Sequence, residues 1–247
     1  MTSTSIPVVP AEPTEPVRRA VMVQRWADLV YLHWRYDPAV VQALLPDGLE
    51  VDVADGSAWV GLIPFRMEGL GLPHLAPLPL VGTFPEVNVR TYVIRNGRRA
   101  VWFFSLDVDR ILPVVGARAG FHLPYCVARA SHTRAGDILT TSVERRWPRP
   151  PHGTGTTSIA VRDLGPDLTD DPLDRFLTAR WGLFAGTRRG RFRYAPVDHP
   201  AWPLRHAELL HLDDRLVAAA GLPQPEGAPR VRWSPGVDVR IGLPARA

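Results

Sequence analysis

Alternating apolar and polar positions run through most of this chain and predict β-strands. One side of the first such segment, ADLVYLHWRY, carries Leu29, Tyr31, His33 and Arg35. Between residues 49 and 147, runs such as SAWVGLIPFRM, EVNVRTYVIR, RAVWFFSLDVD and DILTTSVERRW repeat the pattern. A last run, GVDVRIGL, lies near the end of the sequence. The chain is therefore predicted to be rich in strands.

Helix signals are few and short. Asp37-Pro38 precedes AVVQALL, which predicts a helix that ends at Pro46-Asp47-Gly48. TDDPLDRFLTARWGLF predicts a second helix, with an aspartate cap, that ends before Gly186. A third is predicted over residues 213–220. This order predicts an α+β, β-rich fold, in which a curved antiparallel sheet or barrel encloses a small pocket and carries a few flanking helices.

Length and composition suit one domain. Residues 1–16 contain four prolines and small polar residues, which predicts a disordered arm before a single domain over residues 17–247. The chain lacks the roughly 20 consecutive apolar residues of a membrane span, and its start lacks the pattern of a secretion signal. We therefore expect a cytoplasmic protein with no membrane partner, while the sequence leaves open whether it forms a homo-oligomer.

The charged residues argue against several function classes. The formal net charge is only +4 and the arginines are spread over the chain, so nucleic acid is not an expected partner. One cysteine forms no internal disulfide, and the spacing of His206 and His211 does not match a helical metal pair, so no metal site is expected. The sequence contains no phosphate loop, dinucleotide fingerprint or GxSxG elbow, and no cofactor is expected. All 29 basic residues are arginine, which excludes imine formation by a lysine side chain.

Asn96-Gly97 is the strongest hairpin signal in the chain. A two-residue turn there pairs Arg95 with Arg98, Tyr92 with Val101, Arg90 with Phe103, Asn88 with Ser105, and Glu86 with Asp107. One face of this hairpin would then collect Glu86, Asn88, Arg90, Tyr92, Ser105 and Asp107, while the opposite face is apolar. Such a polar face is either the solvated side of a sheet or, inside a barrel, a site that handles protons or binds a carboxylate.

The segment GARAGFHLPYC, residues 116–126, places an arginine, a histidine, a Pro-Tyr step and the single cysteine among apolar residues. Together with LLPDGLEVD, DGSAWVGLIPFRM, FPEVNVRTYV, FFSLDVD, FLTARW, HPAWPL and SPGVDVRI, it resembles the YqjF-like bacterial proteins of uncharacterised function. These belong to the acetoacetate decarboxylase-like superfamily. The resemblance spans nearly the whole chain after the arm, and it implies a curved antiparallel sheet around a small pocket.

The resemblance also implies which residues line that pocket. In the decarboxylases the corresponding segment carries an arginine, then five residues, a proline and two lysines, the first of which forms an imine with the substrate. Arg118 and Pro124 keep this spacing here, while Tyr125 and Cys126 stand where the lysines would be. The pocket glutamate of the decarboxylases resembles Glu86. Decarboxylation by that mechanism is therefore unavailable to this chain.

Two function classes follow for a small-molecule ligand such as an oxo acid. The first is an enzyme that uses Glu86 and Tyr125 for acid–base chemistry of the lyase or isomerase type. The second is a non-catalytic protein that binds or senses the same ligand. In both, the residues expected to bind the ligand are Arg118, Arg90, Asn88, Ser105, Asp107 and His33.

Overall fold

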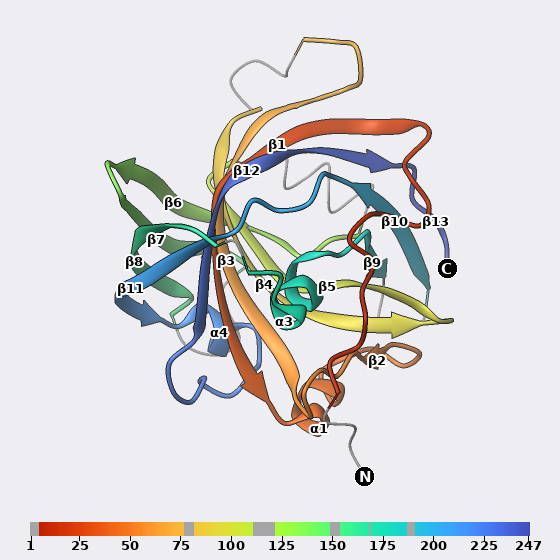
Figure 1. Ribbon diagram of the computed structural model, residues 1–247, viewed down its shortest axis with the longest axis horizontal. Coiled ribbons are helices and arrows are strands. Elements are labelled where there is room, and N and C mark those ends of the chain that lie inside the picture. The colour runs from red at the N-terminus through yellow and green to blue at the C-terminus, as the bar shows by residue number, and fades with distance from the viewer. Residues whose placement is uncertain (1–4, 77–81, 111–121, 149–153, 168, 187–190) are drawn as a thin grey trace.

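Long strands dominate the structure of this chain (Figure 1). The computed structural model describes residues 5–76, 82–110, 122–148, 154–167, 169–186 and 191–247. The strands are β1 (Ala20–Tyr36), β2 (Glu50–Val51), β3 (Ala58–Gly71), β4 (Phe84–Arg95), β5 (Arg98–Val108), β6 (Tyr125–Ala135), β7 (Ile138–Trp147), β8 (Thr156–Pro166), β9 (Gly182–Gly186), β10 (Phe192–Asp198), β11 (Arg205–Asp214), β12 (Arg230–Gly242) and β13 (Ala245–Arg246). The helices are α1 (Pro38–Gln42), α3 (Pro172–Thr178) and α4 (Leu216–Ala219).

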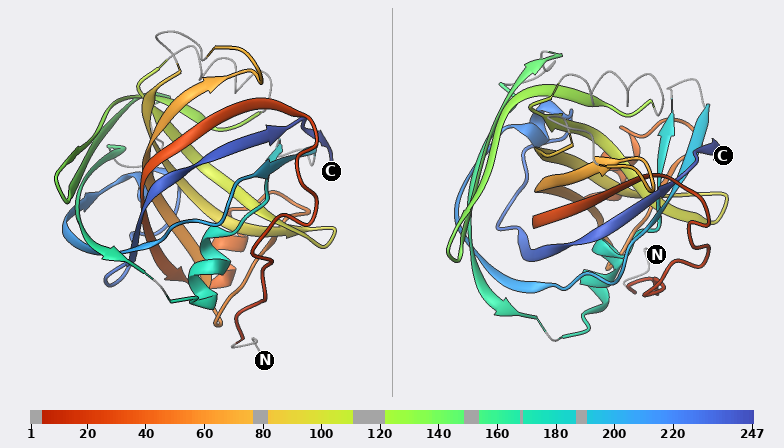
Figure 2. Two further views of the ribbon diagram at one scale, coloured as in Figure 1. Left: turned by 45° about the horizontal axis from the view of Figure 1, so that its top comes forward. Right: turned by 90° about the horizontal axis from the view of Figure 1, so that it is seen from above.

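Nine of the strands pair in a ring. The order is β4, β5, β6, β7, β8, β11, β12, β1 and β3, after which β3 pairs with β4. All neighbours in this ring are antiparallel except β5 and β6, which are parallel. The view from above in Figure 2 shows how strongly the strands curve. The predicted fold class, a β-rich α+β protein on a curved sheet with few helices, is confirmed.

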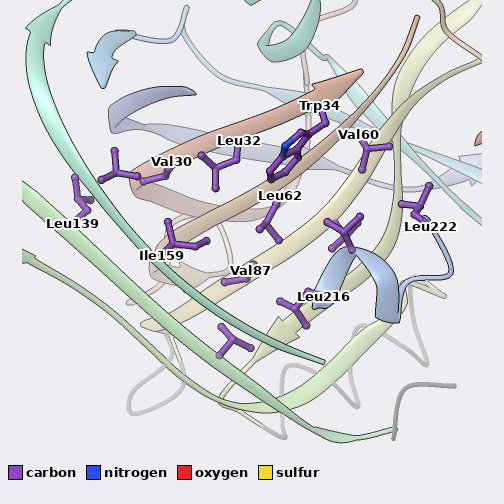
Figure 3. Packing of buried hydrophobic residues seen from close by; sticks show 14 of the residues in the cluster. Val30, Leu32, Trp34, Val60, Leu62, Val87, Leu139, Ile159, Leu216 and Leu222 are labelled. Carbon is purple, nitrogen blue, oxygen red and sulfur yellow. The ribbon is translucent and has the colours of Figure 1, made fainter. Parts of the chain in front are cut away.

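A second set of pairings places protein on both faces of the central strands. β9 pairs in parallel with β5 and antiparallel with β10, and β10 in turn pairs with β12. Strands β12, β1, β3, β4 and β5 thus have protein packed on both sides. One side packs against β7, β8 and α4, in a cluster that Figure 3 shows around Leu32, Leu62 and Val87. The other side packs against α3, β9 and β10.

This arrangement explains why β1, β3 and β4 carry so few exposed positions. On β1, Val30 and Leu32 belong to the first cluster, whereas Tyr31 belongs to a separate buried cluster on the other side. The alternation expected along ADLVYLHWRY is therefore present, but it separates two interiors rather than an interior from solvent. His33, next to Leu32 in sequence, is buried as well.

The β4–β5 hairpin follows the predicted register for its first half. Asn96 and Gly97 adopt φ angles of 50° and 74°, the positive values that a tight hairpin turn needs. From the turn, the predicted pairs run as far as Arg90 opposite Phe103. Beyond this pair a bulge shifts the register by one residue, so that Val89 lies opposite Ser105.

The predicted pairs beyond the bulge are wrong. Glu86 lies opposite Val108 rather than Asp107, and Asn88 lies opposite Leu106 rather than Ser105. Because a shift of one residue moves a strand's side chains to the other face, Ser105 and Asp107 no longer share a face with Glu86. The turn fixes the register only locally, and the remaining pairing depends on what β5 contacts farther along.

All three helices are shorter than predicted, and α1 ends at Gln42 rather than before Pro46. α3 begins as expected, with the Asp171 side chain accepting hydrogen bonds from Leu173 N at 2.7 Å and Asp174 N at 3.3 Å, but it ends at Thr178. Residues that were predicted to continue this helix form strand β9 instead, because their backbone pairs with β10 and β5. α4 likewise starts only at Leu216, since residues 213 and 214 belong to β11. Sheet pairing with distant strands overrides the local helix pattern in both places.

The segment assigned by composition to a disordered arm lies against the domain from residue 5 onward. Val9 is only 4% exposed and packs in the same cluster as α3. The Trp181 indole donates to the carbonyl of Pro10 at 3.2 Å, and the backbone N–H of Val17 donates to Asp198 at 3.3 Å. Residues 5–19 are called the arm below.

Candidate functional site

Three polar side chains of β4 point into the interior beside α3. Glu86, Asn88 and Arg90 alternate along the strand and are 2%, 4% and 8% exposed. Tyr31 and His33 of β1 occupy the same side, because β3 lies between β1 and β4 and keeps both strands in register. The predicted polar face of β4 is therefore buried rather than solvated.

Tyr125 hydrogen-bonds directly to Glu86. The Tyr125 hydroxyl donates to Oε2 of Glu86 at 3.2 Å. The pairing of β6 with β5 makes this contact, since Tyr125 lies opposite Leu106 and Leu106 lies opposite Asn88. The side chain of Asn88 also hydrogen-bonds to Glu86. The predicted contact between the tyrosine and the glutamate is present.

The carboxyl group of Glu86 is protonated at neutral pH. Burial removes water from the carboxylate and raises the pKa of Glu86 to about 8, although the hydrogen bonds from Tyr125 and Asn88 oppose this effect. Burial also raises the pKa of the Tyr125 phenol well above its ordinary value, and the nearby Glu86 adds to the increase. A carboxyl group with a pKa near 8 can both donate and accept a proton around neutral pH.

Arg90 is a buried cation without a carboxylate partner among the described residues. Its Nη2 donates to the carbonyl of Leu177 at 3.3 Å, while its Nε has no hydrogen-bond partner. The guanidinium carbon lies 5.8 Å from the centre of the Tyr31 ring and 5.6 Å from that of Tyr92. A buried charge without an opposite charge is unfavourable, so this position suits an anionic ligand.

His33 is hydrogen-bonded to Tyr92, which is in turn hydrogen-bonded to the backbone of α3. The Tyr92 hydroxyl donates to the carbonyl of Leu177 at 2.6 Å, so its oxygen is left to accept from Nε2 of His33, also at 2.6 Å. Burial, with a smaller contribution from Arg90, lowers the pKa of His33 well below its ordinary value. His33 is therefore neutral, and one of its ring nitrogens is already used within the protein.

The predicted ligand-binding residues Ser105 and Asp107 lie on the opposite face of the sheet. Asp107 accepts hydrogen bonds from Nε and Nη2 of Arg145 at 2.6 and 2.7 Å, and from the Ser105 hydroxyl at 3.0 Å. Burial raises the pKa of Asp107, and the contacts with Arg145 oppose that increase. The bulge places these residues beside β7, away from the side of β4 that carries Glu86.

The last predicted site residue, Arg118, and the single cysteine belong to the segment GARAGFHLPYC. Arg118 lies outside the described residues. Cys126 is buried, and its sulfur lies 3.6 Å from the carbonyl oxygen of Pro124. Within the described part of the chain, no group of three or more histidine, cysteine or acidic side chains could hold a metal ion. No described helix is long and apolar enough to span a membrane.

The structure adds aromatic residues that sequence reasoning did not include in the site. Tyr31, Trp26 and Trp202 join the predicted Tyr125 in one cluster, where Trp26 stacks on Trp202 with ring centres 6.0 Å apart. The Tyr31 hydroxyl, Trp26 Nε1 and Asn88 Oδ1 have no hydrogen-bond partner among the described residues, as is true of Arg90 Nε. Unsatisfied buried polar atoms are rare and often mark a place for water or ligand. The alternation of ADLVYLHWRY, which puts Tyr31 on the same strand face as His33, is the sequence feature that could have indicated Tyr31 as a site residue.

Two sequence comparisons match most of the chain. The profile of DUF2071, described as an uncharacterized conserved protein, matches residues 23–238. The chain is 34% identical to the uncharacterized protein YqjF of Bacillus subtilis (strain 168) over 221 residues, which is 89% of each chain.

Solved structures with the same fold have low sequence identity. Acetoacetate decarboxylase from Legionella pneumophila matches with a TM-score of 0.63 at 13% identity, over 97% of this chain and 90% of that one. An acetoacetate decarboxylase-like enzyme from Sphingomonas wittichii RW1 matches with a TM-score of 0.63 at 15% identity, over 92% and 93%. The enduracididine biosynthesis enzyme MppR, in complex with pyruvate, matches with a TM-score of 0.63 at 14% identity, over 98% and 96%.

Proposed function

The chain belongs to the DUF2071 family, and from its buried site we propose that it binds a small oxo acid and acts on it by acid–base chemistry. Glu86 and Tyr125 are the proposed acid–base pair, and Arg90 is the proposed partner of the ligand's carboxylate. The observation that carries this proposal is the partly buried hydrogen bond of 3.2 Å between Tyr125 and Glu86, on the strand face that also holds Arg90.

The residue types suit the two ends of such a ligand. A guanidinium binds a carboxylate with directed hydrogen bonds, and the Nε of Arg90 has none among the described residues. Tyr125 can donate to a carbonyl oxygen, and Glu86 can exchange a proton with the neighbouring carbon. Arg90 and Glu86 are four residues apart on an extended strand, so their Cα atoms are about 13 Å apart. A ligand that contacts both lies along Asn88, which favours oxo acids longer than pyruvate.

The proposed step is proton exchange next to the carbonyl group. Glu86 in its carboxylate form accepts a proton from this carbon, the C–H electron pair forms the C=C bond of an enolate, and the carbonyl π electrons move onto the oxygen. The Tyr125 hydroxyl stabilises that oxygen by donating a hydrogen bond. Return of a proton from Glu86 to carbon restores the oxo acid. No imine is involved, since the sequence contains no lysine.

The likeness of fold supports a small-molecule ligand of this kind. MppR, named above, is described in complex with pyruvate, which is itself an oxo acid. At 14% identity this likeness concerns the fold, so the ligand class for the present chain depends on its own residues.

Proton NMR in D₂O tests the proposal with oxo acids of three to six carbons. We expect the signal of the proton next to the carbonyl to disappear faster with the protein, and the rate to rise with pH through about 8 as Glu86 ionises. Glu86→Gln should abolish this acceleration, whereas Glu68→Gln, at a partly exposed ion pair with Arg66, should retain it. Binding without any accelerated exchange would assign the protein to the non-catalytic class, and a failure of the whole series to bind would refute the proposal.

A further inference from the structure

A cavity lies under the arm, at the end of β4 that is remote from Glu86. Its volume is about 260 Å³, and it is bounded by the arm, by the β4–β5 turn and by the residues that follow α3. Figure 1 shows the arm passing beside β9 and β10 before it enters β1. Val9, Pro10, Thr14 and Glu15 are the residues of the arm that line this cavity.

The lining of this cavity has an excess of positive charge. Arg98, Arg99 and Arg180 line it, and Glu15 is the one acidic residue among its described lining residues. Both oxygens of the Glu15 carboxylate lie 3.4 Å from Nη2 of Arg98. Arg99 and Arg180 both pair with the buried carboxylate of Asp52, which does not itself line the cavity.

Arg180, which lines the cavity, has an unused donor. Its side chain is 3% exposed, and its guanidinium carbon lies 4.7 Å and 4.2 Å from the ring centres of Tyr92 and Phe176. Nε donates to the carbonyl of Phe176 at 2.8 Å and Nη1 to Asp52 at 2.7 Å. The buried Nη2 has no hydrogen-bond partner among the described residues. A buried donor without an acceptor is unfavourable, and Arg180 is one of the three arginines that an anion in the cavity would approach.

Aromatic groups form part of the same wall. Trp181 and Tyr194 line the cavity, and the hydroxyl of Tyr194 donates to the carbonyl of Trp181 at 3.0 Å. The Trp181 indole holds the arm through Pro10. These contacts fix the two rings and the arm around the arginines, so that the cavity is partly formed before a ligand enters.

We propose that this cavity is an anion-binding site for a small phosphate-bearing molecule, and that the carboxylate of Glu15 competes with the ligand for Arg98. Planar guanidinium groups match the oxygens of a phosphate. Once the ligand displaces Glu15 from Arg98, the three arginines exceed the carboxylate of Asp52 by two positive charges, which a dianion compensates better than a monocarboxylate does. The site is independent of the function proposed for Glu86 and Tyr125.

Calorimetric titration of the full chain with inorganic phosphate, at constant ionic strength, tests the site. We expect saturable binding that Arg98→Gln weakens by roughly fivefold and Glu15→Gln strengthens by roughly fivefold, since each substitution alters one partly exposed ionic contact. Glu12→Gln, on the exposed part of the arm, changes the net charge as Glu15→Gln does, and Arg193→Gln, on β10, changes it as Arg98→Gln does. Both controls should leave the affinity unchanged. Melting temperatures measured alongside confirm that each variant is folded.

Three outcomes would overturn the proposal. Phosphate binding that does not saturate would show that the cavity is not a site. Equal effects of Glu15→Gln and Glu12→Gln would show that only net charge matters. Acetate binding as tightly as phosphate would contradict the assignment of a phosphate-bearing ligand.

Discussion

The phenol oxygen of Tyr125 lies 3.2 Å from Oε2 of Glu86, although the two residues are 39 positions apart in the sequence. Two strand pairings bring them together, β4 with β5 and β5 with β6. The contact connects a buried acid to a partly buried phenol, and each affects the other's pKa. Substitutions at either residue test what this hydrogen bond contributes to the pKa of Glu86 and to function.

Replacing Tyr125 with phenylalanine removes the hydroxyl but keeps the ring. The pKa of Glu86 should rise above its value of about 8, because the hydrogen bond from Tyr125 lowers it. The free energy of unfolding should fall by only about 1 kcal/mol, as is usual for one hydrogen bond. Carbon-13 NMR titration of the glutamate carboxyl groups measures the pKa. Tyr36→Phe, which removes a hydroxyl that donates to Pro223, is the matched control and should not change it.

Glu86 should make the protein less stable as the pH rises. The folded protein keeps the Glu86 proton up to a pH of about 8, whereas the unfolded chain loses it near 4.5, so the folded state binds more protons between these values. The free energy of unfolding therefore decreases with pH in this window, by at most about 1.4 kcal/mol per pH unit for this group. Glu86→Gln should flatten the curve obtained by urea denaturation from pH 5 to 8.5. Parallel curves for the two proteins would mean that Glu86 has an ordinary pKa.

The ion pair between Asp107 and Arg145 should be essential for stability. Both side chains are buried, so Arg145→Leu leaves an unpaired carboxylate and should lower the free energy of unfolding by about 3–5 kcal/mol. Arg146→Leu, next in the sequence but at a half-exposed pair with Glu144, should cost at most about 1 kcal/mol. Urea denaturation measures both. A double replacement of Asp107 and Arg145 by leucine should recover much of the loss, and its failure to do so would point to a role beyond charge pairing.

Borohydride should trap no covalent adduct between this protein and an oxo acid within the folded domain. Reduction traps an imine, and the sequence offers no lysine to form one. Incubation with pyruvate and borohydride, followed by peptide mapping by mass spectrometry, makes the measurement. An adduct on any peptide other than the first would contradict the acid–base chemistry proposed here.

The sequence by itself determined the features that depend on neighbouring residues. Asn96-Gly97 sets a tight turn and with it the pairing of β4 and β5 as far as Arg90 and Phe103. Alternation along EVNVRTYVIR places Glu86, Asn88 and Arg90 on one side of a strand. Asp171 caps α3 by accepting hydrogen bonds from the backbone N–H groups of Leu173 and Asp174. Each of these follows from local backbone geometry and hydrogen bonding, which short stretches of sequence encode.

Only the tertiary structure decided which faces are buried and where the hairpin leaves its register. The bulge after Phe103 turns Asp107 toward Arg145 on β7, while Glu86 stays on the side that holds Arg90 and Tyr125. Neither result can be read from alternation, because a strand with protein on both faces has no solvated side to mark its orientation. The energetic reason is long-range, since a buried carboxylate must reach a cation or keep its proton, and here Asp107 does the first and Glu86 the second.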